Sequence, residues 1–435
     1  MHFMKFIIKF ILYALVLILF PFYFLSTVSQ LIKNINKIKS TNIIVMMSGL
    51  GFGNSIQGID IMRRFYNNKN PLFVIIGWGY NNPYVVNLWG ETNVVYIKSF
   101  LGKKLINSKY LSFVNSLIIN VIKNILVFII ESITKNKIIE LMELYKESIS
   151  VSENGLNAIN KYIDIYPNYN GFVFVPWYYL IKNVKVDKAT LPENYKALIE
   201  SKLNKYLLKC GDKNSNKLCC LYIRAKGEKS KNITSIMRDG TQIETYLPIM
   251  KRLIDEGYII LLTGDRKLDK KYISKFNNKV ISSEFLKVNS DIYFLFAATE
   301  ADIFIGNDGG GSQLPIVNNI PSLIINAFPV DGPGFVNASI LFKTIYDNKG
   351  ELVDYKKLFE HYPYDYNIND YKIYNNTPEE MDLAVKYFLY DIKQNCLNKN
   401  KDSIMSSIPN HLLIKYTNST ISKAWPNLKF ENQNN

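Results

Sequence analysis

The stretch FIGNDGGGSQLPIVNNIPSLIINAFP, residues 304–329, places a glycine-rich loop between two apolar runs. Its loop, GNDGGGS at 306–312, follows a strand-like segment and precedes a short helix-like one. Such a corner is typical of the carboxyl edge of a parallel sheet, where open α/β folds bind ligands. Bare backbone N–H groups near a helix N-terminus suit an anion. The stretch therefore predicts an anion site on an α/β fold, although a turn that needs only left-handed backbone also explains the glycines.

Strand-like and helix-like segments alternate on both sides of this loop. The second half of the chain predicts strands near 218–224, 258–264, 302–306 and 321–327, and helices near 245–257 and 291–301. The first half predicts a strand at 41–47, a glycine loop, a helix and a second strand at 70–77. Nearly continuous apolar strands in this order favour parallel sheets. We predict the α/β class, with two Rossmann-like domains that face a cleft.

Two arginines lie near the expected carboxyl edge of the second sheet. Arg224 ends a strand in YIRAKGEK, and Arg238 comes just before a helix. A planar guanidinium binds a diphosphate in bidentate fashion, whereas a solvated surface position explains either arginine equally simply. Together with the loop, the predicted diphosphate-binding residues are Arg224, Arg238, Gly306, Asn307, Asp308, Gly309, Gly310, Gly311 and Ser312. Weaker candidates beside them are Lys226, Asp239, Tyr246 and Asp265.

A second glycine corner occurs in the first domain, in SGLGFGNSIQGID at 48–60. The corner residues are Gly49, Gly51, Phe52 and Gly53, and close packing of helix on strand explains them as well as ligand binding does. Asn54 and Asp60 are the candidate catalytic groups. Asp60 is either a general base or a charge on an exposed helix face.

Composition limits the other functions. The 435 residues carry a formal charge of +15, but the lysines are scattered and form no long basic block. We therefore expect contact with an anionic membrane surface or anionic substrate rather than nucleic acid. Four cysteines and three histidines show no zinc-site spacing, so we expect reduced thiols, no metal and no cofactor.

The N-terminus carries an uncharged run of 23 residues, Phe10–Ile32, with lysines on both sides. Its length predicts a membrane anchor, although a cleaved signal peptide or a kinked segment that re-enters the same face remains open. We expect catalytic domains in the cytoplasm, held at the inner (cytoplasmic) membrane by this single anchor. The segment 111–130 is apolar with one polar stripe, which suits a buried helix or one lying in the membrane interface.

Four motifs resemble those of bacterial GT-B glycosyltransferases linked to surface polysaccharide (capsule or O-antigen type) synthesis. They are GFGNSIQGIDIMRR, YIR, MRDGTQIETYLP and GNDGGGSQLPIVNNIP, and the likeness covers residues 41–425. Asn54 and Ile223 stand where that family has histidines. The resemblance implies that Arg224 and the loop 306–312 hold the diphosphate of a nucleotide sugar, while the first domain takes the acceptor.

These observations together predict a metal-independent glycosyltransferase that moves a sugar from a nucleotide-sugar donor to a glycan or lipid-linked acceptor. The alternatives are a nucleotide-sugar epimerase of the same fold and a non-catalytic glycan-binding or assembly protein. The expected domains are a membrane anchor and basic spacer (1–40), an acceptor domain (41–212), a donor domain (213–395) and a tail that packs back on the fold (396–435).

Overall fold

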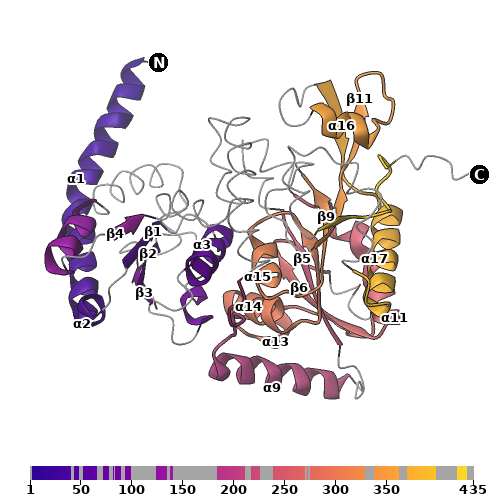
Figure 1. Cartoon of the computed structure of the whole chain (residues 1–435), viewed down its shortest axis with the longest axis horizontal. Helices are drawn as coiled ribbons and strands as arrows, with labels where there is room; N and C mark the ends of the chain where they lie inside the picture. Colours follow the sequence, from indigo (N-terminus) through magenta and orange to yellow (C-terminus); the bar gives the residue numbers. More distant parts are fainter. Residues whose placement is uncertain are drawn as a thin grey trace, which may run out of the picture. The chain divides into compact units, whose positions relative to one another are not determined.

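The computed structural model describes residues 2–40, 44–48, 52–65, 72–77, 82, 84–89, 94–98, 124–134, 138–140, 184–210, 217–225, 239–269, 272, 275–328, 338–361, 370–397 and 419–428. The chain divides into two compact units. The first comprises residues 1–156 and 182–187, and the second comprises 157–181 and 188–435. Each unit is built on a parallel sheet with helices against it (Figure 1), so the α/β class predicted from the sequence is correct.

The first unit contains a four-stranded parallel sheet with the order β3-β2-β1-β4. Its elements are β1 (Ile44–Ser48), α3 (Phe52–Phe65), β2 (Leu72–Gly77), η1 (Val85–Asn87), β3 (Val94–Lys98) and β4 (Ile138–Glu140). This is the 3-2-1-4 order of a Rossmann-like half. The glycine corner therefore follows the strand at which the order reverses.

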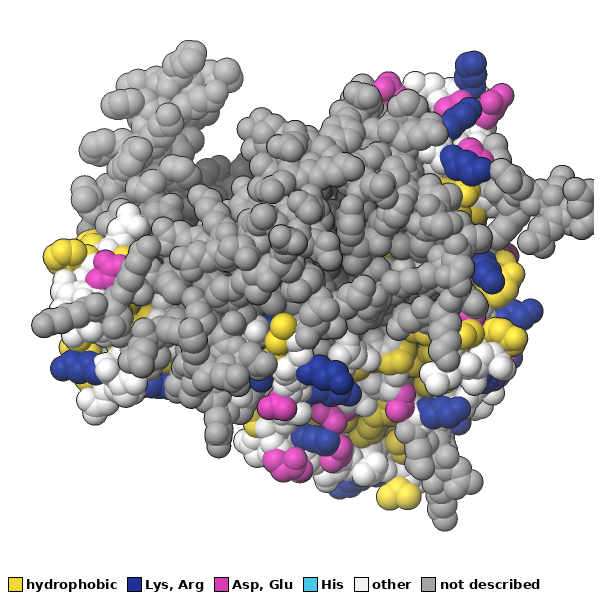
Figure 2. Space-filling model, in the orientation of Figure 1, with side chains coloured by type: hydrophobic (Ala, Val, Ile, Leu, Met, Phe, Trp, Pro, Cys, Tyr) yellow, Lys and Arg dark blue, Asp and Glu magenta, His cyan; other side chains and the backbone are white. Residues whose placement is uncertain are grey.

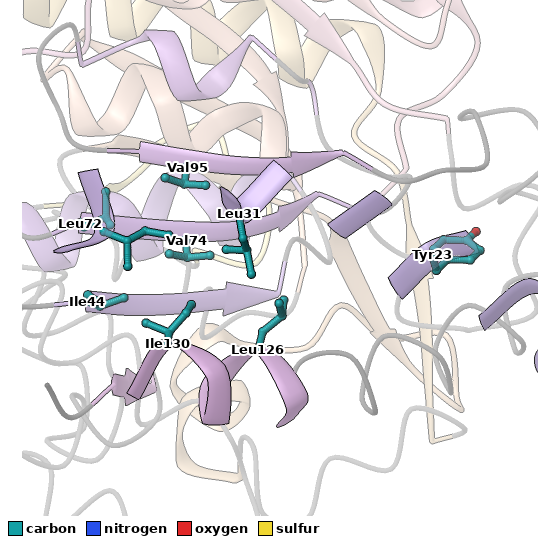
Figure 3. Close-up of a cluster of buried hydrophobic side chains, with 9 residues drawn as sticks. Tyr23, Leu31, Ile44, Leu72, Val74, Val95, Leu126 and Ile130 are labelled. Carbon is teal, nitrogen blue, oxygen red and sulfur yellow. The ribbon is translucent and has the colours of Figure 1, made fainter. Parts of the chain in front are cut away.

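Two helical segments cover this sheet. They are α1 (His2–Lys33) with its short continuation α2 (Ile35–Lys39), and a helical segment at 124–134. Leu31 and Ile38 from the first pair share one buried cluster with Leu126 and Ile130 from the second, against strand residues such as Val74 (Figure 3). The apolar residues of both segments are thus partly explained by core packing.

This packing differs from the predicted anchor, which would be surrounded by lipid. Tyr23, Thr27 and Leu31 of α1 are all at least 95% buried in the folded unit. Within the part of the chain that the structure describes, no helix is long and apolar enough to cross a membrane.

The second unit contains a seven-stranded parallel sheet with the order β13-β10-β9-β8-β5-β6-β7. Its strands are β5 (Lys217–Ile223), β6 (Tyr258–Gly264), β7 (Val280–Ile281), β8 (Ile303–Asn307), β9 (Ser322–Ala327), β10 (Ala338–Phe342) and β13 (Thr420–Ile421). Counted from β5, the first six strands lie in the 3-2-1-4-5-6 order of a Rossmann fold. They are buried along nearly their whole length, as expected for a sheet covered on both faces.

Helices lie on both faces of this sheet (Figure 1). One layer contains α11 (Leu247–Asp255), which follows η5 (Ile243–Tyr246), and α17 (Pro378–Lys393). The other layer contains α13 (Ser283–Leu286), α14 (Ser290–Glu300) and α15 (Gln313–Val317), the last of which follows η6 (Gly310–Ser312). Arg252 and Asp382 join α11 to α17 through an ion pair. Thr377 caps α17 in a capping box with Glu380, as its sequence predicts. A hairpin of β11 (Thr344–Asp347) and β12 (Tyr371–Tyr374) and the helix α16 (Tyr355–His361) follow β10 in the chain.

The second unit begins earlier in the chain than the expected residue 213. The amide of Asn318 exchanges hydrogen bonds with the backbone of Ala189, at 2.9 and 2.8 Å. Helix α9 (Glu193–Lys209) packs against α13 and α14, and Lys196 pairs with Glu300 at 2.7 Å. These contacts place α9 in the second unit.

The C-terminal segment 419–428 also lies on this unit. β13 pairs with β10, so the tail supplies the seventh strand of the sheet. Trp425 is 1% exposed, packs on Phe342 and donates its indole N–H to the carbonyl of Lys343 at 3.1 Å. These contacts hold the end of β10 and the backbone of Lys343, which directly follows it.

Candidate functional site

The candidate site lies where the strand order of the second sheet reverses. From β5 the chain runs through α11 to β6 and β7 on one side, and then returns to β8 on the other side of β5. The carboxyl ends of β5 and β8 therefore diverge into separate connections, which leaves a crevice at this point in open α/β sheets. Arg224 directly follows β5 and Asn307 ends β8.

Asn307 joins these strand ends. Its Oδ1 accepts a hydrogen bond from the backbone N–H of Arg224 at 3.0 Å. Its Nδ2 donates to the hydroxyl of Tyr246 at 3.1 Å and to the carbonyl of Ile325 at 3.3 Å. Asn307 and Tyr246 are both 0% exposed, and burial raises the pKa of the Tyr246 hydroxyl. Both were candidate ligand contacts, but their partners and burial assign them to shaping the strand ends.

Arg224 is held by a carboxylate and by a glycine. Its Nη1 lies 3.2 Å from Asp239 Oδ1, and the two side chains are 14% and 6% exposed. The Arg224 carbonyl accepts from the N–H of Gly240 at 2.8 Å, which ties the segment before η5 to the end of β5. A Cβ on Gly309 would lie 3.1 Å from Arg224 Cδ, so the arginine stem runs along the loop. The structure thus brings Arg224, Asp239 and the glycine loop together, as the sequence predicts.

Backbone conformation and close packing explain the glycines of this loop more specifically than anion binding does. Gly309 has φ +153° and ψ −175°, a combination that is nearly exclusive to glycine. A Cβ on Gly311 would lie 2.5 Å from the ring of Tyr222, and one on Gly306 would lie 2.9 Å from Tyr222 Cβ. Two of the glycines are therefore required by close packing of the loop on β5.

Ser312 does not cap the helix that follows it. Its hydroxyl donates back to the carbonyl of Gly309 at 2.8 Å, and it makes no capping hydrogen bond. The helix α15 has only five residues and is preceded by the 3-10 turn η6. The predicted partial charge of a long helix N-terminus is consequently weak at this loop.

Lys343 is a site residue that the sequence analysis missed. It directly follows β10, is 4% exposed, and its Nζ donates to the carbonyl of Asp239 at 3.1 Å and to the side chain of Asn375. Burial lowers its pKa to about 8, whereas the carboxylates of Asp239 and Asp308 oppose that shift. A lone lysine in the apolar run ASILFKTIYD was the available signal.

The site therefore combines two cations, Arg224 and Lys343, with two carboxylates, Asp239 and Asp308. Both carboxylates are buried (5% and 6% exposed), and a buried negative charge is costly unless a cation lies nearby. Arg224 and Lys343 supply those cations. Asp265, another candidate, accepts from the N–H of Ala225 at 3.0 Å and so fastens the residues after β5. Lys226 and Arg238 lie outside the described residues.

The first-unit candidates are less informative. Gly49 and Gly51 lie outside the described residues, Phe52 and Asn54 are placed in the first turn of α3 by backbone alone, and Gly53 is buried. Asp60 is 0% exposed and pairs with Arg64 at 2.7 Å one turn later. Arg64 in turn donates to the carbonyl of Val184. This arrangement favours a role in holding α3 to the backbone at Val184 over a role as general base.

No group of three or more His, Cys, Asp or Glu side chains with metal-site geometry occurs among the described residues.

No protein-family model and no curated protein matches the sequence. Among solved structures, the chain is similar to E. coli ADP-heptose LPS heptosyltransferase II, with 9% identity, a TM-score of 0.43, and coverage of 81% of this chain and 99% of that one. It is also similar to a family 9 glycosyl transferase from Veillonella parvula DSM 2008, with 11% identity, a TM-score of 0.44, and coverage of 82% and 99%. At these identities and TM-scores the likenesses assign neither a family nor an activity to the chain.

Proposed function

We propose that the chain is a glycosyltransferase that binds a nucleotide-sugar donor at the carboxyl edge of its second sheet. The observation that carries this proposal is the meeting of Arg224, Lys343 and the Gly309 loop at the point where the strand order reverses. Open α/β sheets bind nucleotides at that point, and the two cations supply the positive charge that a diphosphate requires. The acceptor is a glycan or lipid-linked glycan in surface polysaccharide synthesis.

The chemical demand on such a site is stabilisation of the departing nucleoside diphosphate. The side chain of Arg224 is 14% exposed and Asp239 fixes its orientation, and we propose that its guanidinium binds phosphate oxygens of the donor. Lys343 has a pKa of about 8 and is therefore mostly protonated at neutral pH. Fixed cations in a partly buried site stabilise developing negative charge without reorganisation. We propose that these side chains do this work without a metal ion.

Asp308 has a separate role in this proposal. It directly follows β8, within the loop 306–312, and its charge raises the pKa of Lys343 against the lowering by burial. A carboxylate repels a diphosphate but accepts hydrogen bonds from hydroxyl groups. We therefore assign it to a hydroxyl of the donor ribose or sugar. The first unit, with its own glycine corner after β1, takes the acceptor.

The test is release of nucleoside diphosphate from nucleotide sugars, with and without glycan acceptors, and with and without EDTA. Release that needs an acceptor and survives EDTA supports metal-independent transfer. Arg224→Ala is expected to lower the rate by about 10²- to 10³-fold, the usual effect of removing one group that stabilises transition-state charge. Arg252→Ala is the control, because it removes an arginine that also pairs with an aspartate but lies on α11, outside the site, with 31% of its side chain exposed.

Other results would redirect the assignment. Interconversion of a free nucleotide sugar without acceptor would identify an epimerase. Folded protein that releases no diphosphate with any donor would favour the non-catalytic glycan-binding alternative. Loss of release in EDTA, restored by a divalent metal, would contradict the metal-independent mechanism.

A further inference from the structure

Helix α1 is apolar on two opposite faces. Tyr23, Thr27 and Leu31 form its buried face, each at most 5% exposed. Apolar residues also face solvent, with exposed fractions of 61% for Ile18, 52% for Phe22, 64% for Leu25 and 64% for Ile32. At about 100° per residue these four fall within about 80° of one another, on the side of the helix opposite the buried face. Core packing therefore explains only one of the two apolar faces.

The neighbouring helical segment continues this exposed surface. Ile133 is 40% exposed beside the buried Leu126 and Ile130 of the same segment, whereas Phe128, which is 71% exposed, lies about 140° from Ile133 around the helix. A pocket lined only by aliphatic side chains joins the segment to α1 and α2, and Ile32 and Ile133 both line it. We call Ile18, Phe22, Leu25, Ile32 and Ile133 the apolar face. Large exposed side chains gathered in this way mark an interaction surface.

The charge beside the apolar face has a single sign on α1 and α2. Lys33, Lys37 and Lys39 follow Ile32 directly, and no Asp or Glu occurs in the sequence before Asp60. Figure 2 shows yellow hydrophobic side chains on the described surface at the left of the view, with a magenta acidic side chain beside them and dark blue basic side chains below. Glu131 on the neighbouring segment is the acidic residue nearest in sequence to Phe128 and Ile133. Apolar side chains next to lysines complement an anionic lipid surface.

We propose that the apolar face and the three lysines bind the surface of an anionic bilayer, with α1 lying in the interface rather than crossing it. The opposite face of α1 packs on the folded first unit over residues 18–33, so lipid cannot surround that part of the helix. The exposed face can enter the headgroup region while the lysines contact anionic headgroups. This inference is independent of the proposed enzymatic activity, although it would place the chain beside a lipid-linked acceptor.

The experiment is flotation of the full chain with vesicles of phosphatidylcholine, alone or mixed with phosphatidylglycerol. We expect binding to the mixed vesicles that weakens as salt is added, because the lysine contribution is screened. Phe22→Asp with Leu25→Asp should weaken binding by at least about tenfold for each side chain removed from the interface. Changing all three lysines to Gln should weaken it by about 100-fold, from about fivefold for each lysine.

Leu208→Asp is the matched control, since Leu208 is 62% exposed on α9 of the second unit. It should bind vesicles as the unmodified chain does, and circular dichroism should show all variants folded. Binding that is unchanged in Phe22→Asp/Leu25→Asp, or equal binding to neutral vesicles, would overturn the proposal. Light scattering is run in parallel: if the apolar substitutions convert a dimer to a monomer without changing vesicle binding, the face serves self-association instead.

Discussion

Replacing Gly309 by alanine tests how the loop positions Arg224. At φ +153° and ψ −175° the backbone lies in a region that costs a residue with a Cβ about 1 to 3 kcal/mol. The new Cβ would also lie 3.1 Å from Arg224 Cδ, but a flexible side-chain end moves by a few tenths of an ångström at small cost. Backbone strain therefore sets the stability loss, and displacement of Arg224 sets the functional loss.

Differential scanning calorimetry measures the first loss and nucleotide binding the second. A domain of this size loses roughly 2 to 4 °C in midpoint for each kcal/mol, so the second-unit transition should fall by roughly 2 to 12 °C. Gly350→Ala is the control, because Gly350 has φ +83° with nothing within 4 Å of the added Cβ. It should lose about 1 to 2 kcal/mol from strain but keep nucleotide binding. A Gly309→Ala protein with unchanged midpoint and unchanged binding would refute this reasoning.

Three further predictions concern buried polar groups. Tyr246→Phe should lower the free energy of unfolding by about 1 to 3 kcal/mol, because its buried amide partners lose the hydroxyl, whereas Tyr390→Phe at a 60% exposed position should change nothing in urea titrations. Burial lowers the pKa of Lys343 from 10.5 to about 8, so above pH 8 the unfolded chain binds more protons than the folded chain. The free energy of unfolding should therefore rise by about 2 kcal/mol between pH 7 and 9.5. Lys343→Met should remove that rise in urea titrations repeated at each pH. Asp60→Asn and Arg64→Met should each lower the free energy of unfolding by roughly 3 to 5 kcal/mol, because each leaves its buried charged partner unpaired. The double variant should lose less than the sum of the two. An Asp60→Asn protein of normal stability that has no transfer activity would instead identify Asp60 as a general base.

The sequence predicted much of the second sheet because its strands are continuous apolar runs that end at glycines. Residues 258–264 and 303–307 are buried at almost every position, so pattern and structure agree. The edge strand β13 escaped prediction, since two residues are too few to carry a periodic signal. Its place depends on long-range packing of Trp425 against Phe342.

The sequence predicts the position of a site residue that directly follows a strand. It does not predict whether a polar side chain near the sheet edge is exposed to ligand or buried. Arg224 lies where the sequence placed it, directly after β5. Asn307 and Tyr246 looked like ligand contacts because polar residues near an edge face solvent by default, but the structure buries both. Lys343 was missed because its contact with Asp239 depends on strand order and long-range packing, which local sequence does not show.

Helix α1 shows the same limit. Hydropathy does not distinguish a helix surrounded by lipid from one that packs on a sheet through one face and exposes the other. Burial of Tyr23 and Leu31 shows that the C-terminal part of α1 packs on the sheet, and it can be seen only once the sheet is in place.

Isothermal titration of the full chain with UDP, GDP, ADP and CMP tests the central claim most directly. The account predicts that one nucleotide binds, that Arg224→Ala weakens its binding by about 10- to 150-fold through loss of charge-assisted hydrogen bonds, and that Arg252→Ala does not. A folded protein that binds none of them, or binds one equally well after Arg224→Ala, would contradict a nucleotide site at this edge of the sheet.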